Sequence, residues 1–187
     1  METKALRIKN TELDTRLGDI THDFQVQAIV NAANSTLLGG GGVDGAIHRA
    51  AGPKLLEFCR TLGGCPTGEA RLTPAFNLPC AHVIHTVGPV WHGGQRGEAA
   101  LLRSCYMESL NLACAHEIRT LAFPSISTGV YRYPVEQAAT IALNAVRESI
   151  AAHPEAFDRI LFVLFDERTQ AAYIKAIKAL EDLPPLS

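Results

Sequence analysis

The hydrophobic positions of this chain fall into short apolar runs that alternate with longer stretches of mixed polarity. The short runs predict six strands, and apolar residues that recur at helical spacing predict five helices. The expected strands are Leu13–Gly18, Ala28–Asn31, Glu69–Thr73, His82–Val87, Thr120–Phe123 and Arg159–Leu164. The expected helices are Val43–Ala50, Lys54–Thr61, Gly97–His116, Val135–His153 and Thr169–Leu183. This alternation indicates an α/β fold with a mixed, mostly parallel six-stranded sheet, to which Lys4–Leu17 adds an antiparallel edge.

The bulk composition narrows the class of protein. The 187 residues are 47% hydrophobic and 19% charged, and neither a repeat nor a linker divides them, so residues 1–187 are expected to form a single domain. The formal net charge is -2, and no cluster of basic residues offers the patch that nucleic-acid binding usually requires. A phosphate site in this chain would therefore be built from local backbone dipoles.

The sequence also indicates a cellular location. Met1–Asn10 has no apolar core of the kind found in signal peptides, and the longest apolar runs are too short to span a membrane. The five cysteines are odd in number and form no CxxC pair, which is typical of reduced thiols. We expect a cytoplasmic protein without a membrane partner.

The unusual segments of the sequence follow the predicted strands. In an open α/β sheet, ligands bind beyond the carboxyl ends of the strands, so these segments are expected to share one edge of the sheet. They are Gly18–Ile20, Asn31–Asn34 with Gly39–Gly42, Pro124–Tyr131, and Phe165 with Asp166.

Two of these segments have features of phosphate-binding loops. Gly39–Gly42 leads directly into a predicted helix, whose free N–H groups and positive dipole end favour an anion. Ser125–Gly129 offers further N–H groups and hydroxyls, so the two loops together predict a clamp on a diphosphate. Alternatively, both are ordinary strand-to-helix turns. No Lys follows Gly42, as a P-loop requires, and Ala32–Leu38 separates the glycines from the strand, unlike the Rossmann pattern.

The polar residues at this edge have both functional and structural interpretations. Asp44 and His48 share one helix face, so the carboxylate can orient a water while the histidine holds it, and the helix dipole favours an ionised Asp44. Alternatively, Asp44 only caps the helix. Asn31 and Asn34 suit ribose hydroxyls, or they merely tolerate tight turn geometry. Asp19 can accept a hydrogen bond from adenine N6, or it caps a turn.

Other candidate residues have structural interpretations. Phe165 can stack on a base, although core packing is the default for Phe. His85 is expected to be a hydrogen-bonded core histidine. Cys80, His82 and His85 have the spacing of a metal site, but strand side chains alternate between faces, so these groups would not converge and no metal is expected.

Several motifs together resemble the macrodomain family, from about Leu17 to the C-terminus. They are GDIT at 18–21, AIVNAAN at 28–34, GGGGVDGAIH at 39–48, CPTGEA at 65–70, VIHTVGP at 83–89 and STGVY at 127–131. The Gly-Val-Asp step that follows the first glycines resembles the MacroD-type branch, whose members hydrolyse ADP-ribose esters. Arg132 is a departure, because many relatives have a glycine there, as in GVYGYP, and this leaves the choice of substrate open.

The resemblance implies a three-layer α/β/α sandwich that holds ADP-ribose across the edge of the sheet. Asn34, Asp44 and His48 stand in the places of the family's catalytic residues. The implied substrate-binding residues are Asp19 and Ile20 for adenine, Asn31 for the distal ribose, Gly41, Gly42, Val43, Ser127, Thr128, Gly129, Val130 and Tyr131 for the diphosphate, and Phe165 for the adenosine end.

These expectations describe a hydrolase that needs neither a cofactor nor a metal. Its substrates would be O-acetyl-ADP-ribose and proteins mono-ADP-ribosylated on Asp or Glu, and its partners ADP-ribose, its esters and the modified proteins. One alternative is a reader module that binds ADP-ribose without hydrolysis. Another is a phosphatase that acts on ADP-ribose 1″-phosphate. A nucleic-acid partner is disfavoured by the missing basic stretch, and attack at the sugar carbon or at the acyl carbon both stay open.

Overall fold

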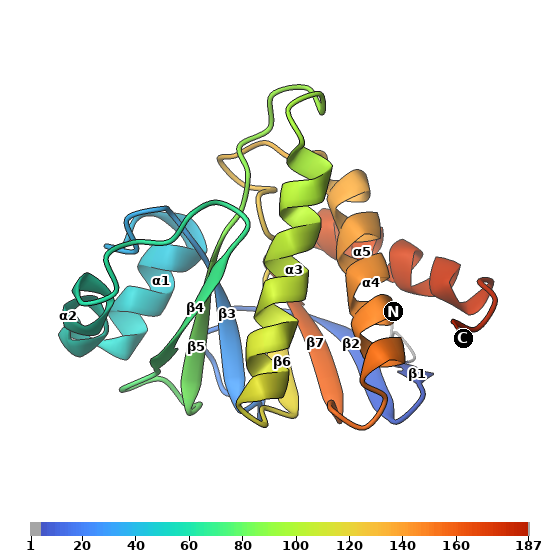
Figure 1. Cartoon of the computed structure of the whole chain (residues 1–187), viewed down its shortest axis with the longest axis horizontal. Coiled ribbons are helices and arrows are strands. Elements are labelled where there is room, and N and C mark those ends of the chain that lie inside the picture. The colour runs from blue at the N-terminus through green and yellow to red at the C-terminus, as the bar shows by residue number, and fades with distance from the viewer. Residues whose placement is uncertain (1–4, 187) are drawn as a thin grey trace.

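The computed structural model describes residues 5–186, which form seven strands and five helices (Figure 1). The strands are β1 (Leu6–Ile8), β2 (Thr11–Leu17), β3 (Ala28–Ala33), β4 (Ala70–Pro74), β5 (His82–Val87), β6 (Thr120–Phe123) and β7 (Arg159–Leu164). The helices are α1 (Gly42–Ala51), α2 (Pro53–Arg60), α3 (Glu98–Ala115), α4 (Val135–Ala152) and α5 (Glu167–Glu181).

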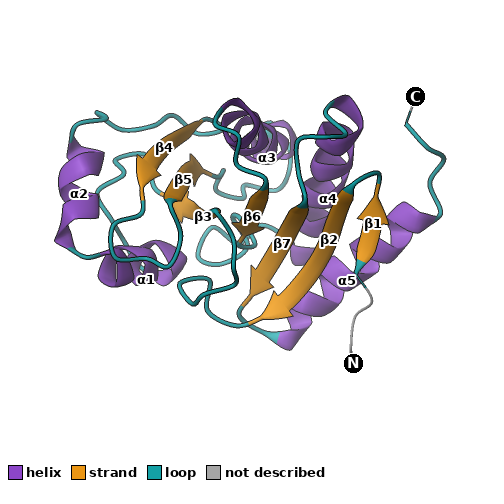
Figure 2. Ribbon diagram, turned by 90° about the horizontal axis from the view of Figure 1, so that it is seen from below, coloured by secondary structure: helices purple, strands orange, loops and turns teal. Residues whose placement is uncertain are grey.

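The strands form one mixed sheet in the order β1-β2-β7-β6-β3-β5-β4 (Figure 2). The five central strands are parallel, and the edge strands β1 and β4 run antiparallel to their neighbours β2 and β5. The predicted count of six strands is therefore wrong by one. The additional strand, β1, has only three residues, too few to show a period-two pattern. It confirms the antiparallel edge expected within Lys4–Leu17, although Lys4 itself lies outside the described residues.

The predicted elements match the observed ones closely. The bounds of β5, β6 and β7 agree with the prediction, and those of the other elements differ by one or two residues at an end. Helix α5 begins two residues before the predicted start at Thr169. The reason is that the Asp166 carboxylate accepts a hydrogen bond from the Thr169 backbone N–H at 2.7 Å and caps an earlier first turn.

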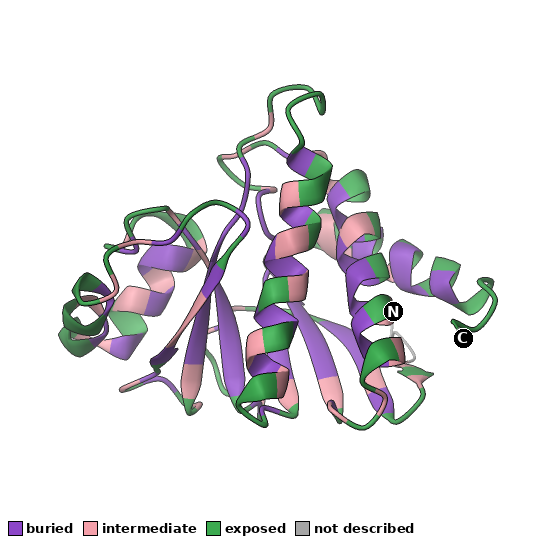
Figure 3. Ribbon diagram, viewed as in Figure 1, coloured by how far each residue is buried: buried purple, intermediate pink, exposed green. Residues whose placement is uncertain are grey.

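The helices cover the sheet in two layers with separate apolar cores, as in a three-layer sandwich. Helices α1 and α2 pack against one face, whereas α3, α4 and α5 pack against the other (Figure 1). The alternating residues of β7 illustrate this, since Phe162 belongs to the core of the α3–α5 side and Leu161 and Val163 belong to the core of the α1–α2 side. The central strands are consequently buried along most of their length (Figure 3).

This topology gathers the predicted loops at one edge of the sheet. Because β3, β5, β6 and β7 are parallel, the segments that follow them leave the sheet on the same side (Figure 1). Within residues 5–186, no helix has the combination of length and hydropathy that crossing a bilayer requires.

Candidate functional site

A cavity of about 570 Å³ opens where β3, β6 and β7 end. Its volume lies within the range that is typical of small-molecule sites. All predicted site residues except Asp19, Ile20, Asn31 and His48 line it. Its walls are formed by Ala32, Ala33, Asn34, Gly40, Gly41, Gly42, Val43, Asp44, Gly88, Pro124, Ser125, Ile126, Ser127, Thr128, Gly129, Val130, Tyr131, Val163, Phe165, Asp166 and Thr169.

The glycine loop before α1 brings bare backbone to the cavity. Gly39 and Gly42 have φ angles of 88° and 58°, in the left-handed region that glycine adopts without strain. No side chain caps the start of α1, so its first N–H groups are free to bind a ligand. A Cβ at Gly45 would lie 2.5 Å from the backbone oxygen of Gly40, so only glycine lets the loop pack this closely on the helix. The loop and the helix dipole together suit an anion.

The loop that follows β6 contributes another wall with an unusual backbone. Ser127 has a φ of 67°, which costs a non-glycine residue about 1 kcal/mol and is common at ligand sites. Its hydroxyl oxygen is buried and has no hydrogen-bond partner among residues 5–186. Thr128 Oγ1 donates to Ser125 Oγ at 2.7 Å and stabilises the loop. Val130 is 91% exposed beside it. This loop thus contains a buried hydroxyl beside Gly88 that has no hydrogen-bond partner in the described part of the chain.

Asp44 places a buried carboxylate on the cavity wall beside the glycine loop. Asn31 Nδ2 donates to Asp44 Oδ1 at 2.8 Å, and His48 Nε2 lies 3.4 Å from the same oxygen. The other oxygen, Oδ2, is buried and without a partner in the described part of the chain. Burial raises the pKa of Asp44, and this effect outweighs the opposite effects of the Asn31 hydrogen bond and of His48. Burial thus outweighs the ionising influence expected from the helix dipole.

Asn31 and Asn34, the two asparagines in β3 and just after it, have different surroundings. Asn34 lines the cavity, and its Nδ2 donates to the Gly39 carbonyl at 2.8 Å, which holds the glycine loop in place. Asn31 is fully buried and lies beneath Asp44, away from the cavity wall. The reason is that β3 continues to Ala33, so Asn31 is a strand residue rather than part of the turn. Contact of Asn31 with the distal ribose stays a prediction.

His48 lies beside the Asp44 carboxylate but does not line the cavity. Its side chain is 14% exposed, and it approaches Asp44 from the next turn of α1. The predicted trio therefore divides into Asn34 and Asp44 on the wall and His48 beside Asp44.

The far end of the cavity lies at the carboxyl end of β7. Phe165, expected to flank a base, lines this end and is 61% exposed, so its ring is available for stacking. Asp166 and Thr169, which belong to the first turn of α5, also line it.

Asp19 and Ile20 lie next to this end but outside the wall. Gly18 N donates to Leu164 O at 2.9 Å, which brings the end of β2 beside Phe165. Asp19 Oδ1 accepts hydrogen bonds from the backbone N and the Oγ1 of Thr21, which lower the pKa of Asp19, so this carboxylate caps its own turn. Ile20 is 2% exposed in the core. Contact of either residue with adenine stays a prediction.

Three wall residues lie outside both the predicted site residues and the segments that the sequence placed at this edge of the sheet. They are Gly88, Val163 and Thr169. Gly88 is the most informative of them, because a Cβ there would overlap Ser127 Oγ and Ile126 Cγ2. The signal in the sequence was a glycine directly after a buried strand.

Arg132 has the backbone conformation that favours glycine. Its φ is 61°, and its side chain is exposed outside the cavity wall. This explains in physical terms why a glycine suits this position in sequences that resemble this chain.

His85 is confirmed as a hydrogen-bonded core histidine. It is fully buried, its Nδ1 lies 3.1 Å from Asn31 Nδ2, and its Nε2 lies 2.9 Å from Thr73 Oγ1. Within residues 5–186, no three His, Cys, Asp or Glu residues are grouped so that they could hold a metal ion.

The sequence and the structure both have close counterparts among known proteins. The Macro domain family matches residues 30–142. A macro domain-containing protein of Chlorobaculum tepidum is 63% identical over 161 residues, which cover 86% of this chain and 92% of that protein. A Klebsiella pneumoniae protein named O-acetyl-ADP-ribose deacetylase is 56% identical over 161 residues, which cover 84% of this chain and 91% of that one.

A solved structure extends the similarity to the fold. A variant of the Oceanobacillus iheyensis macrodomain with ADPR has a TM-score of 0.90 and 40% sequence identity to this chain. The match covers 96% of this chain and 99% of that one.

Proposed function

Because this chain belongs to the Macro domain family, we propose that it binds ADP-ribose and hydrolyses ADP-ribose esters. The esters are O-acetyl-ADP-ribose and proteins mono-ADP-ribosylated on Asp or Glu. The observation that carries the proposal is the carboxylate of Asp44, a residue of the cavity wall, one of whose oxygens is buried and has no hydrogen-bond partner among residues 5–186. The relative named O-acetyl-ADP-ribose deacetylase supports the ester chemistry. The cytoplasmic location and the modified-protein partners stay predictions.

The ligand is proposed to lie along the cavity from Asp44 to Phe165. The diphosphate binds the N–H groups of the glycine loop and of Ser127–Tyr131, and the unpaired Ser127 hydroxyl donates to it. The distal ribose lies beside Asn34, and the adenine lies beside Phe165, within reach of Asp19.

Asp44 is proposed to act as a general base. A water held between Asp44 Oδ2 and the diphosphate attacks the ester, and the carboxylate takes the proton of that water. The ester bond breaks, and the products are ADP-ribose and a free carboxylic acid, whichever carbon is attacked. Asn31 donates a hydrogen bond to Oδ1, and His48 Nε2 lies 3.4 Å from the same oxygen, so Oδ2 is the oxygen proposed to accept the proton. A carboxylate whose pKa is raised by burial is a stronger base than an exposed one.

The variant Asp44→Ala separates catalysis from binding. Loss of a general base typically lowers the rate about 10²- to 10⁴-fold, so release of ADP-ribose from an Asp/Glu-modified protein should fall by that factor in single-turnover experiments. Affinity for ADP-ribose, measured by calorimetry, should stay unchanged or rise, because one negative charge near the diphosphate is removed.

The matched control is Asp23→Ala, which removes an exposed aspartate outside the cavity and should keep wild-type turnover. If Asp44→Ala retains turnover within about threefold of wild type, which corresponds to less than 1 kcal/mol, the general-base assignment is wrong. Wild-type protein that binds ADP-ribose but releases none from any ester would be a reader. Phosphate release from ADP-ribose 1″-phosphate would instead indicate the phosphatase.

A further inference from the structure

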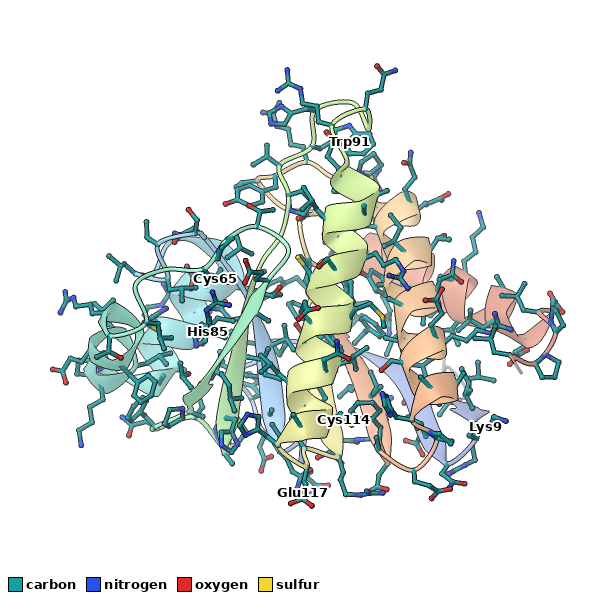
Figure 4. The ribbon with its side chains drawn as sticks, in the orientation of Figure 1. Lys9, Cys65, His85, Trp91, Cys114 and Glu117 are labelled. Carbon is teal, nitrogen blue, oxygen red and sulfur yellow. The ribbon has the colours of Figure 1, made fainter. Side chains whose placement is uncertain are left out.

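A chain of hydrogen bonds leads from Asp44 into the core through side chains of four elements. Asp44 belongs to α1, Asn31 to β3, His85 to β5 and Thr73 to β4. Asn31 Nδ2 lies 2.8 Å from Asp44 Oδ1 and 3.1 Å from His85 Nδ1, and His85 Nε2 lies 2.9 Å from Thr73 Oγ1. His85, labelled in Figure 4, lies on the side of β5 that faces α1 and α2. All but Asp44 are at most 1% exposed.

When Asp44 is ionised, only one assignment of donors and acceptors fits this series of hydrogen bonds. The carboxylate only accepts hydrogen bonds, so the Asn31 atom that faces it is the NH₂ nitrogen. The same nitrogen faces His85 Nδ1, which must therefore be the unprotonated acceptor. His85 then carries its proton on Nε2 and donates to Thr73 Oγ1. The Thr73 hydroxyl in turn donates to the Pro74 carbonyl at 3.0 Å. The position of each proton in this series of hydrogen bonds, from Asp44 to the Pro74 carbonyl, is thus defined.

We propose that His85 is a positioning residue for Asp44 and acts through the amide group of Asn31. His85 accepts one N–H of Asn31 and thereby directs the other N–H at Asp44 Oδ1. The Asp44 carboxylate is held by one oxygen, and its second oxygen, buried beside the glycine loop, has no hydrogen-bond partner among residues 5–186. This inference rests on the proposed function, in which that second oxygen takes the proton of the attacking water.

The observed orientation of the Asn31 side-chain amide leaves one of its polar atoms without a partner. Its carbonyl oxygen is buried and has no hydrogen-bond partner among the described residues. A buried unpaired acceptor is unfavourable, so an unconstrained amide would rotate to satisfy it. Rotation would direct that oxygen at the Asp44 carboxylate and at His85 Nδ1. Both of these are acceptors, so the oxygen would gain no hydrogen bond. The Asp44 carboxylate and the acceptor on His85 therefore select the observed amide orientation together.

The surroundings of His85 keep this acceptor available. Burial lowers the pKa of His85 to about 3, with a further contribution from His48, whose ring centroid lies 6.4 Å away. The other neighbour of the ring is Cys59 Sγ on α2, at 4.0 Å from Nε2. The titratable groups near the ring are thus His48, Cys59 and, beyond Asn31, Asp44. His85 is neutral at physiological pH, and Nδ1 keeps its lone pair.

Two substitutions at His85 distinguish positioning from packing. His85→Leu has a similar volume and no acceptor, so kcat for ester hydrolysis should fall roughly 10- to 100-fold, the range for residues that orient catalytic ligands in metal sites. Affinity for ADP-ribose should stay within about threefold of wild type, which is less than 1 kcal/mol. His85→Asn carries an amide oxygen at the same bond distance from Cα as Nδ1 and should recover most of kcat, although it packs less well.

The pH dependence of kcat is a second readout that packing alone would not move. The Asn31 hydrogen bond lowers the pKa of Asp44, so its loss in His85→Leu should raise that pKa and move the acidic limb of the kcat profile to higher pH. The matched control is His82→Asn, three residues earlier on β5 at a half-buried position. This variant should leave kcat and the acidic limb of its pH profile unchanged.

An NMR measurement tests the inference without turnover. The ¹⁵N shifts of His85 should identify the Nε2–H tautomer, and titration of the Asp44 carboxyl carbon should give a higher pKa in His85→Leu than in wild type. An Nδ1–H tautomer, an unmoved Asp44 titration, or equal loss of kcat in the Leu and Asn variants would overturn the positioning role. Wild-type protein that lacks esterase activity but shows the expected tautomer and titration shift would contradict the proposed function alone.

Discussion

The buried histidine makes the stability of this protein depend on pH in a way that can be calculated. His85 has a pKa lowered to about 3 in the folded protein, against an ordinary value of 6.5. Between these values the unfolded chain binds a proton that the folded chain does not, so unfolding is favoured as pH falls. At a pH more than about one unit above 6.5 the imidazole is neutral in both states, and His85 contributes no pH dependence.

The magnitude follows from the difference between the two values. One pKa unit corresponds to about 1.4 kcal/mol, so complete titration would cost about 5 kcal/mol of unfolding free energy by pH 3. About 2 kcal/mol of this is lost between pH 7 and pH 5. For a protein with a typical stability of roughly 5–15 kcal/mol, this one group contributes a large part of the acid sensitivity.

Urea unfolding of wild type, His85→Asn and His85→Leu at pH 7, 6 and 5 measures this contribution. The two variants differ in absolute stability because they pack differently, but neither titrates at this position. The unfolding free energy of wild type relative to either variant should therefore fall by about 2 kcal/mol from pH 7 to pH 5. A difference that stays constant over this range would refute the conclusion that His85 is neutral and desolvated in the folded state.

Two further predictions concern the loop after β6 and Gly88, the residue after β5 that packs against this loop. Arg132→Gly should raise the unfolding free energy by up to about 1 kcal/mol, because Arg132 has a φ of 61°, and thermal unfolding should show a rise of roughly 2–4 °C; an unchanged or lower melting temperature would contradict this. Gly88→Ala should lower stability by about 1–3 kcal/mol and weaken ADP-ribose binding measured by calorimetry, because its Cβ would displace Ser127 and Ile126. Gly129→Ala, whose Cβ would meet no atom within 4 Å, is the stability control and should melt as wild type.

The sequence by itself determined the features that depend on neighbours along the chain. Apolar runs of strand length predicted β5, β6 and β7 to the residue, and glycines before a helix predicted the loop that forms one wall of the cavity. The rule that ligands bind beyond parallel strand ends then placed the segments after β3, β6 and β7 at a common edge. These inferences succeed because helix dipoles, glycine φ angles and strand alternation are local properties.

Only the tertiary structure decided the features that depend on register and burial. Asn31 lies opposite His85 because β3 pairs with β5 in that register, a contact between residues 54 positions apart. No pattern along the chain specifies such a register, and so the hydrogen bond from Asn31 to Asp44 and its contact with His85 could not be predicted from the sequence. The raised pKa of Asp44 likewise follows from desolvation, since packing around α1 removes water that an isolated helix start would keep.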